Sequence, residues 1–380
     1  MTGWAWGGSE DLWALMALRA LDSGHKVSAC LAFRPRPNHV KFKALEEAGA
    51  QTFCRSSSHS TMRAHQLARV LRMFHRDLGE SLRERLSPLR AFFATDPDVV
   101  LISDGGAIPA LEVMQVVEKC CASKPYLMLC QSNPEELSRD EEHRRRSITF
   151  YDKARAACFV AEDNWRSTER QLAHKLANGR VIRNPVNLAG VDPLPWPQEK
   201  STAFASVARF DVHYKGHDIL FEVLAAPRWR ERDWHLSLYG SGRDDAYIRD
   251  LVKFYALQDR VIFRGETRDI RTVWQDHHVL VLPSRFEGTP LSMVEAMLCG
   301  RPVVGTEIAG IPEWVREGQS GFLADAATPK CFGEALERAW QQREHWQAMG
   351  SRGREDALRL YDPRPADSLL AIIMEAANAR

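Results

Sequence analysis

The sequence predicts an α/β protein in which helices cover both faces of parallel sheets. Short apolar runs recur along the 380 residues, and amphipathic helical patterns separate them. The runs are rich in Val, Ile and Leu and do not alternate with polar residues, which is typical of parallel strands buried on both faces. One proline-rich stretch, residues 183–201, interrupts this pattern and indicates a linker between two α/β halves.

The expected elements follow in chain order. In the first half, we predict a helix at 110–120 and strands at 98–103, 126–130 and 157–162. In the second half, we predict strands at 235–240, 261–265, 279–284 and 302–306. Helical patterns cover residues 216–225, 268–275, 290–300 and, at the end of the chain, 365–379. Sheets of this kind bind ligands at the carboxyl ends of their strands.

The N-terminus departs from this alternation. Gly7 and Gly8 precede a helical pattern at 10–24, and a glycine-rich turn that opens a helix normally follows a strand directly. The residues before Gly7 leave no room for a strand, so we expect the first strand of this half to be missing. The predicted domains are an N-terminal one at 1–190 and a C-terminal one at 200–360, followed by a helix within 361–380.

Composition excludes several classes of protein. The net charge of +1 gives no global basic field for binding nucleic acid. No apolar run approaches the ~18 residues of a transmembrane helix, and the N-terminus lacks the pattern of a signal peptide. The eight cysteines form no C-x-x-C pair and no cluster with zinc-ligand spacing. We therefore expect reduced, buried thiols in a cytoplasmic protein.

Two glutamates eight positions apart carry the first functional signal. Glu287 follows the strand at 279–284, so it lies in the turn at the carboxyl end of that strand. Glu295 lies about one and a half turns into the next helix, beside its buried apolar stripe. A carboxylate can accept hydrogen bonds from the vicinal hydroxyls of a ribose. The alternative is an ordinary capping acid followed by a solvated helix acid.

The residues around these acids suit a nucleotide. Backbone amides near Gly288, Thr289 and Leu291 open the helix, and a helix N-terminus favours a phosphate. In the segment 206–216, Arg209 comes just past a strand and Lys215 just before a helix. Two cations there can neutralise a diphosphate leaving group, although surface cations are the alternative.

Two further strand ends carry similar chemistry. The turn at Gly240 closes one strand, and Arg264 closes the next one. Because the carboxyl ends of parallel strands meet at one edge of the sheet, we expect these residues to join the two acids and two cations.

From about residue 202 to 325, the sequence resembles the C-terminal nucleotide-sugar domain of family 4 retaining glycosyltransferases, which have the GT-B fold. Glu287 and Glu295 match the E-x7-E signature of that family, and Arg209 and Lys215 match the R…K-G pair of its donor loop. The stretch PLSMVEAMLCGRPVVGTEIAGIPEWVREGQSGFL resembles the family's run from this helix through a G-x-P-V-V strand to an E-x-x-x-x-G-x-x-G-F turn.

The resemblance implies a fold and a reaction. In the GT-B fold, two Rossmann-like, doubly wound parallel-sheet domains face a central cleft, and the C-terminal helix returns to the N-terminal domain. Gly7 and Gly8 resemble the first-domain glycine loop near the donor phosphates. The implied reaction moves a sugar from a nucleotide sugar, such as a UDP- or GDP-sugar, to an unidentified glycan, lipid-linked sugar or small molecule. The anomeric configuration is retained, and no metal or other cofactor is implied.

The resemblance also implies roles for individual residues. Glu287 would face the transferred sugar, and Glu295 would hold the ribose hydroxyls. Arg209 and Lys215 would stabilise the departing nucleoside diphosphate, which would help to deprotonate the acceptor.

The acceptor side departs from the family pattern. The family often carries a histidine in a first-domain loop, but the corresponding loops at 103–107 and 130–135 contain none. The polar candidates in these loops are Asp104, Gln131 and Asn133. The alternative is that they are turn residues that satisfy backbone groups.

Residues 63–90 form a basic amphipathic pattern, with leucines and a phenylalanine at helical spacing and an arginine-rich opposite face. Such a helix can lie on an anionic membrane, which suits a transferase with a lipid acceptor at the inner membrane face. Core packing with a solvated arginine face is the alternative.

Two other functions compete with sugar transfer. The missing strand and histidine favour a catalytically impaired GT-B protein that binds a nucleotide or serves as a scaffold. An NDP-sugar epimerase shares the two-domain architecture, but the four matched side chains fit transfer better.

Overall fold

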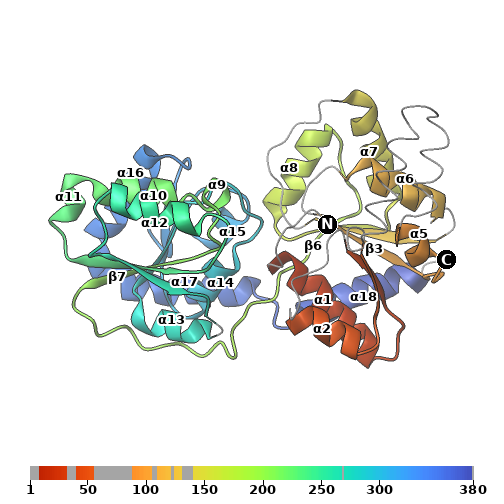
Figure 1. The fold of residues 1–380 in the computed structure, drawn as a ribbon, viewed down its shortest axis with the longest axis horizontal. Helices are drawn as coiled ribbons and strands as arrows, with labels where there is room; N and C mark the ends of the chain where they lie inside the picture. The colour runs from red at the N-terminus through yellow and green to blue at the C-terminus, as the bar shows by residue number, and fades with distance from the viewer. Residues whose placement is uncertain are drawn as a thin grey trace. The chain divides into compact units, whose positions relative to one another are not determined.

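The computed structural model describes residues 8–31, 40–54, 88–104, 109–120, 124–130, 140–267 and 269–378. The chain divides into two compact units. The first unit consists of Met1–Val160, Trp165–Pro185 and Pro363–Arg380. The second consists of Ala161–Asn164 and Val186–Asp362. Both units are α/β, as expected, and each is described by itself below (Figure 1).

The described part of the first unit contains two parallel sheets. One sheet pairs β1 (Ser28–Leu31) with β2 (Gln51–Cys54). The other has the order β3 (Val100–Asp104), β4 (Tyr126–Cys130), β5 (Ala156–Phe159) and β6 (Gly179–Val181). The helices are α1 (Gly8–Asp22), α2 (Val40–Glu47), α5 (Pro88–Phe93), α6 (Leu111–Cys120), α7 (Glu141–Lys153), α8 (Glu162–Leu172) and α18 (Pro365–Asn378). Residues 1–7 lie outside the described residues, so the expected absence of a strand before Gly8 stays a prediction.

The last helix of the chain, α18, packs against the first, α1. Leu369 and Ile373 of α18 lie in the same buried cluster as Leu12 of α1. Near the end of the interface, Arg19 Nε donates to Asp367 Oδ1 at 2.7 Å. The two ends of the chain therefore belong to the same unit, although the whole second unit separates them in sequence.

The second unit is built on one parallel sheet in the order β12, β11, β10, β7, β8, β9. Its strands are β7 (Thr202–Val207), β8 (Trp234–Tyr239), β9 (Val261–Gly265), β10 (Val279–Leu282), β11 (Val303–Thr306) and β12 (Gly321–Ala324). This is the doubly wound order. The chain starts in the middle of the sheet at β7, adds β8 and β9 on one side, and then returns to add β10, β11 and β12 on the other side of β7. The point where the order reverses lies between β7 and β10.

Helices cover both faces of this sheet (Figure 1). They are α9 (Val212–Lys215), α10 (His217–Ala225), α11 (Pro227–Arg230), α12 (Asp245–Phe254), α13 (Ile270–Asp276), α14 (Leu291–Leu298), α15 (Ile311–Trp314), α16 (Pro329–Gln341) and α17 (Trp346–Leu360), with a 3-10 turn at Arg343–His345. The helices α10, α12 and α16 share one buried cluster with the sheet, and α13, α14 and α15 share the other.

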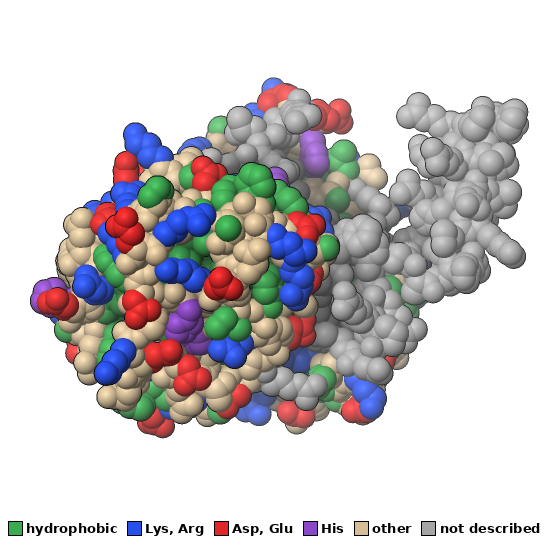
Figure 2. Space-filling view, turned by 60° about the vertical axis from the view of Figure 1, so that its left-hand side comes forward, with side chains coloured by type: hydrophobic (Ala, Val, Ile, Leu, Met, Phe, Trp, Pro, Cys, Tyr) green, Lys and Arg blue, Asp and Glu red, His purple; other side chains and the backbone are tan. Residues whose placement is uncertain are grey.

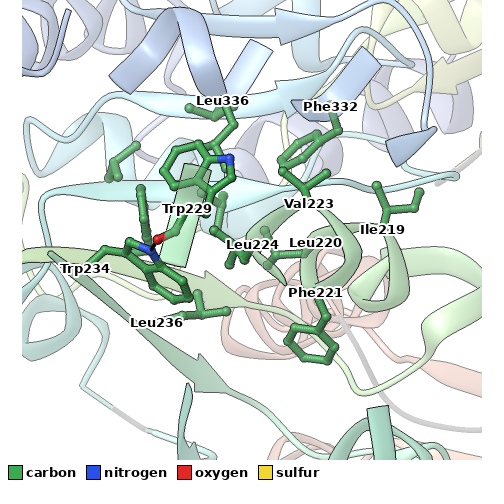
Figure 3. Close-up of a cluster of buried hydrophobic side chains, with 14 of the residues drawn as sticks. Ile219, Leu220, Phe221, Val223, Leu224, Trp229, Trp234, Leu236, Phe332 and Leu336 are labelled. Carbon is green, nitrogen blue, oxygen red and sulfur yellow. Dashed lines mark hydrogen bonds between the residues drawn. The ribbon is translucent and has the colours of Figure 1, made fainter. Parts of the chain in front are cut away.

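The cluster that contains α10, α12 and α16 packs large apolar side chains between these helices and the sheet. Figure 3 shows Val223 of α10 beside Phe332 of α16, with Trp229 and Trp234 packed near the sheet. Because the indole Nε1 of Trp234 donates to the Trp229 carbonyl at 2.7 Å, this polar atom is satisfied inside the core.

The expectation of buried thiols holds for only part of the cysteines in the residues that the structure describes. Cys130, Cys158 and Cys299 are buried, and Cys30, Cys54 and Cys331 are half-buried. Burial raises the pKa of Cys158 to about 12 and that of Cys299 to about 11, so both remain neutral at physiological pH.

The surface carries both signs of charge. On the face that Figure 2 turns toward the viewer, Lys and Arg side chains are interspersed with Asp and Glu. None of the helices in the described ranges combines the length and the apolar character needed to cross a bilayer. Most of the basic amphipathic stretch at 63–90 lies outside the described residues, so its membrane contact stays a prediction.

A buried histidine gives the second unit a defined pH dependence. The backbone N–H of Ala203 donates to Nδ1 of His278 at 3.1 Å, so that nitrogen must be unprotonated. Burial, and then the charge of Arg301, lowers the pKa of His278 to about 4. Burial lowers the pKa of His217 to about 4 as well. Both pKa values lie below that of an unfolded histidine. The stability that the two neutral histidines contribute is therefore fully present above about pH 6.5 and is lost as the pH falls toward 4.

We predict that His278→Asn makes the free energy of unfolding less dependent on pH. The asparagine Oδ1 can accept from Ala203 but does not titrate, so about 2 kcal/mol of the loss between pH 6.5 and 4 should disappear. The measurement is urea unfolding at a series of pH values. His217 still titrates, so a smaller decrease should remain, whereas an unchanged pH profile would contradict the role given to His278.

Candidate functional site

The site of interest lies at the reversal point of the second sheet. Strands β7 and β10 are parallel neighbours, with Val279 paired to Phe204. The chain leaves β7 toward β8 on one side and leaves β10 toward β11 on the other. The loops that follow these two strands therefore diverge, and a ligand can bind between them at the carboxyl edge of the sheet.

The loop after β7 is held by the loop after β8. Phe210 N donates to the Ser241 carbonyl at 2.9 Å, and Val212 N donates to the carboxylate of Asp244 at 2.8 Å. Gly240, at the end of β8, has a φ of 146°, and a Cβ there would lie 2.0 Å from the Ala208 carbonyl oxygen. A glycine at this position thus lets the two loops approach closely, which fixes the backbone on either side of Arg209.

Gly216 brings Lys215 to the loop after β10. It has a φ of 66°, the left-handed conformation that ends α9 and starts α10. A Cβ at Gly216 would lie 2.0 Å from the Pro283 carbonyl oxygen, so a side chain would separate the two loops. The contact continues where Arg285 N donates to the Tyr214 carbonyl at 2.8 Å, and the rings of Tyr214 and Phe286 pack edge to face.

Lys215 and Glu287 meet at the centre of this contact. The ammonium Nζ lies 2.6 Å from Glu287 Oε1, and the Ser284 hydroxyl donates to the same oxygen at 2.8 Å. The two side chains are 16% and 7% exposed, so the pair is largely shielded from water. An ammonium has three N–H donors, and Glu287 accepts one of them, so Lys215 can donate to an incoming anion without losing this partner.

A second ion pair, between Arg285 and Asp218, links the same segments. The guanidinium of Arg285 makes two hydrogen bonds to the carboxylate of Asp218, at 2.9 and 2.7 Å, and a third to the Val212 carbonyl at 3.0 Å. Burial alone would raise the pKa of Asp218, but the hydrogen bond and charge of Arg285 lower it overall. Arg285 therefore ties α10 and α9 to the strand end that carries Glu287.

Arg209 is an exposed cation in the loop after β7. Its side chain is exposed, and it makes no ion pair with the residues that the structure describes. Burial and then the charge of Lys215 lower the pKa of His217, the first residue of α10, so its imidazole is neutral at pH 7. Arg209 and Lys215 are therefore two cations of the segment between β7 and α10.

The turn before α14 presents backbone amides in a buried setting. Gly288 and Thr289 are buried, and Leu291 is half-buried at the first position of α14. Gly310 N donates to the Gly288 carbonyl at 2.8 Å. A Cβ at Gly310 would lie 2.6 Å from the Thr289 hydroxyl, so this close approach requires the absence of a side chain.

Glu295 is buried, with 2% of its surface exposed. Its Oε1 accepts hydrogen bonds from Asn187, at 2.8 Å from the backbone N–H and at 3.2 Å from the side-chain amide. The expected acid is therefore oriented by a residue more than a hundred positions away in sequence. Sequence patterns could identify Glu295 by its spacing from Glu287, but they carried no signal for Asn187.

Arg264 does not join these residues. Its Nε lies 3.5 Å from the Ser237 hydroxyl of β8, and its side chain lines a different hollow together with His235, Asp276 and His277. The periodicity of β9 explains this outcome, because Arg264 points to the sheet face covered by α13 rather than beyond the strand end. Its assignment to donor binding stays a prediction.

The first-unit candidates are placed only in part. Gly8 is the first residue of α1, and Asp104 is the last residue of β3, at the carboxyl edge of its sheet. Gly7, Gln131 and Asn133 lie outside the described residues. Within the part of the chain that the structure describes, no group of three or more His, Cys, Asp or Glu side chains is arranged to hold a metal ion.

Most of the second unit is similar to a known protein family. Residues 201–342 match the family model described as glycosyl transferases group 1. N-acetyl-alpha-D-glucosaminyl L-malate synthase of Bacillus anthracis is 32% identical over 131 residues, which is 34% of either chain. D-inositol 3-phosphate glycosyltransferase of Thermobifida fusca is 36% identical over 98 residues, 26% of this chain and 23% of that protein. The chain spans only about a third of the length of the curated relatives it matches first.

Solved structures resemble nearly the whole chain. HepE of Anabaena, in complex with UDP, has a TM-score of 0.71 at 17% identity, covering 97% of this chain and 96% of that one. Sucrose-phosphate synthase of Thermosynechococcus elongatus has a TM-score of 0.68 at 19% identity, covering 97% and 92%. At these identities the likeness concerns the fold, and it confirms the expected GT-B fold.

We predict that Lys215→Met destabilises the protein by about 3 kcal/mol, because it leaves the carboxylate of Glu287 buried without its cation. Lys253→Met is the matched control, since Lys253 and Asp250 form an exposed ion pair, at 3.2 Å, that should contribute at most about 0.5 kcal/mol. The measurement is urea unfolding of both variants. Equal effects of the two substitutions would show that the Lys215–Glu287 pair is not a buried constraint.

Proposed function

Because residues 201–342 match the glycosyl transferases group 1, we propose that this protein transfers a sugar from a nucleotide-sugar donor to an acceptor. The observation that carries the proposal is the buried pair of Lys215 and Glu287 at the reversal point of the sheet. This is the edge at which a doubly wound sheet binds a nucleotide, and the pair places a cation there in a shielded environment.

The donor would be held by groups with separate tasks. Lys215, Arg209 and the amides at 288–291 would bind the diphosphate, since a helix N-terminus and two cations favour an anion. Glu287 would face the sugar while it holds Lys215 in place. Glu295 would accept hydrogen bonds from the ribose hydroxyls.

We propose transfer with retention and without a metal ion. The bond between the anomeric carbon and the phosphate oxygen breaks, and its electron pair leaves with the nucleoside diphosphate. The acceptor hydroxyl attacks from the same face, and its proton moves to the departing phosphate oxygen. Lys215 and Arg209 would stabilise the charge that develops on that phosphate, the task that a metal ion performs in other transferases.

A UDP-sugar is the first donor to test, because the HepE structures that share this fold contain UDP or UDP-glucose. A GDP-sugar is the second. The acceptor is not specified by any described residue of the second unit, so a glycan, a lipid-linked sugar and a small molecule all remain to be tested.

A nucleotide-binding protein without transferase activity is the second candidate. One observation favours it: the first-half loops at 103–107 and 130–135, where similar transferases often carry a histidine, contain none. Hydrolysis or transfer of a nucleotide sugar by the purified protein would separate the two candidates.

We predict that Lys215→Ala and Arg209→Ala each lower the turnover of a UDP- or GDP-sugar about 10²- to 10³-fold, because each removes a cation that stabilises the leaving group. Arg228→Ala is the matched control, since this exposed arginine lies on α11, away from the strand ends. Donor hydrolysis and transfer would be followed by release of the nucleoside diphosphate. Wild-type turnover in both site variants would contradict the assignment.

A further inference from the structure

The chain enters the second unit through a connecting segment, residues 186–197, that lies along that unit. The boundary between the units falls between Pro185 and Val186. Val186 and Leu188 then pack against the cluster that also contains α13 and α14. The segment is therefore part of the second unit from its first residue onward, although it has no helix or strand of its own.

Three arginines of the second unit fix the path of the connecting segment. Arg271, Arg354 and Arg301 each donate from the guanidinium to a backbone carbonyl of the segment. The acceptors are, in that order, Gly190 at 2.8 Å, Val191 at 2.7 Å and Pro195 at 2.6 Å. Charge-assisted hydrogen bonds of this kind are stronger than neutral ones, so the register of the segment against the unit is well defined.

Asn187 is the residue of the segment that reaches the candidate site. Its backbone N–H and its side-chain amide both donate to Oε1 of Glu295, at 2.8 and 3.2 Å. Two donors on one oxygen restrict rotation of the carboxylate about its terminal bond. Because Glu295 is almost fully buried, these hydrogen bonds also offset part of the cost of removing its charge from water.

We propose that Asn187 is a positioning residue that sets the orientation of the Glu295 carboxylate for the ribose of the nucleotide. This inference rests on the proposed function, in which Glu295 accepts hydrogen bonds from ribose hydroxyls. The backbone N–H remains in any variant at this position except proline, so the side-chain amide is the part that a substitution can test. Its loss would let the carboxylate rotate without removing it.

The test compares Asn187→Ala with the wild-type protein in calorimetric titrations of UDP and GDP, each paired with its 2′-deoxy analogue. For the nucleotide that binds, we expect Asn187→Ala to weaken affinity roughly tenfold, while affinity for the 2′-deoxy analogue changes little. The ratio of the two dissociation constants is the decisive readout, because general destabilisation would affect both ligands equally. Gln198→Ala is the matched control, since this exposed amide donates only to Trp196 in the described structure.

A second variant keeps the inference testable if Asn187→Ala affects folding. In a Glu295→Gln background, adding Asn187→Ala should produce almost no further loss of affinity, because both changes remove the same interaction. An unchanged ratio of dissociation constants in Asn187→Ala, or full additivity of the two changes, would overturn the inference alone. Failure of the wild-type protein to bind any of the four nucleotides would remove the proposed function, and the inference with it.

Discussion

The close approach of two loops at the middle of the second sheet is the constraint on which the candidate site depends. Parallel pairing brings the ends of β7 and β10 together, but the side chains that matter lie several residues beyond those ends. Gly216 removes the atom that would keep the loops apart, and Lys215 then reaches Glu287. A buried ion pair is a weak source of net stability, so its value here is positional: it places a cation where an anionic ligand can meet it.

Much of the fold could be predicted from the sequence, because buried parallel strands produce continuous apolar runs. Strands β4 and β9 have the predicted bounds, and several other elements differ from prediction by one to a few residues at their ends. The strands that received no predicted range have weaker patterns. In β7, TAFASV contains three small residues, and β6 has only three residues. Their positions depend on pairing with neighbours, which a local pattern does not contain.

The candidate site was predictable where a short motif lies within one loop and helix. Glu287, Glu295 and Lys215 were found in this way, and the structure brings Lys215 and Glu287 into contact. Arg264 shows the limit of the approach, since a residue near a strand end can point to a sheet face instead of the ligand edge. Asn187 shows the other limit, because its contact with Glu295 depends on the path of a segment that has no regular structure.

The acceptors that fix the connecting segment are all main-chain carbonyls, and this has a consequence for sequence divergence. A carbonyl oxygen is present whatever the side chain, so substitutions at Gly190, Val191 or Pro195 can leave the contacts from Arg271, Arg354 and Arg301 in place. Substitutions on the two sides of the contact therefore differ in effect: a change of side chain in the segment can keep the hydrogen bonds, whereas a shorter side chain in place of one of the arginines loses them.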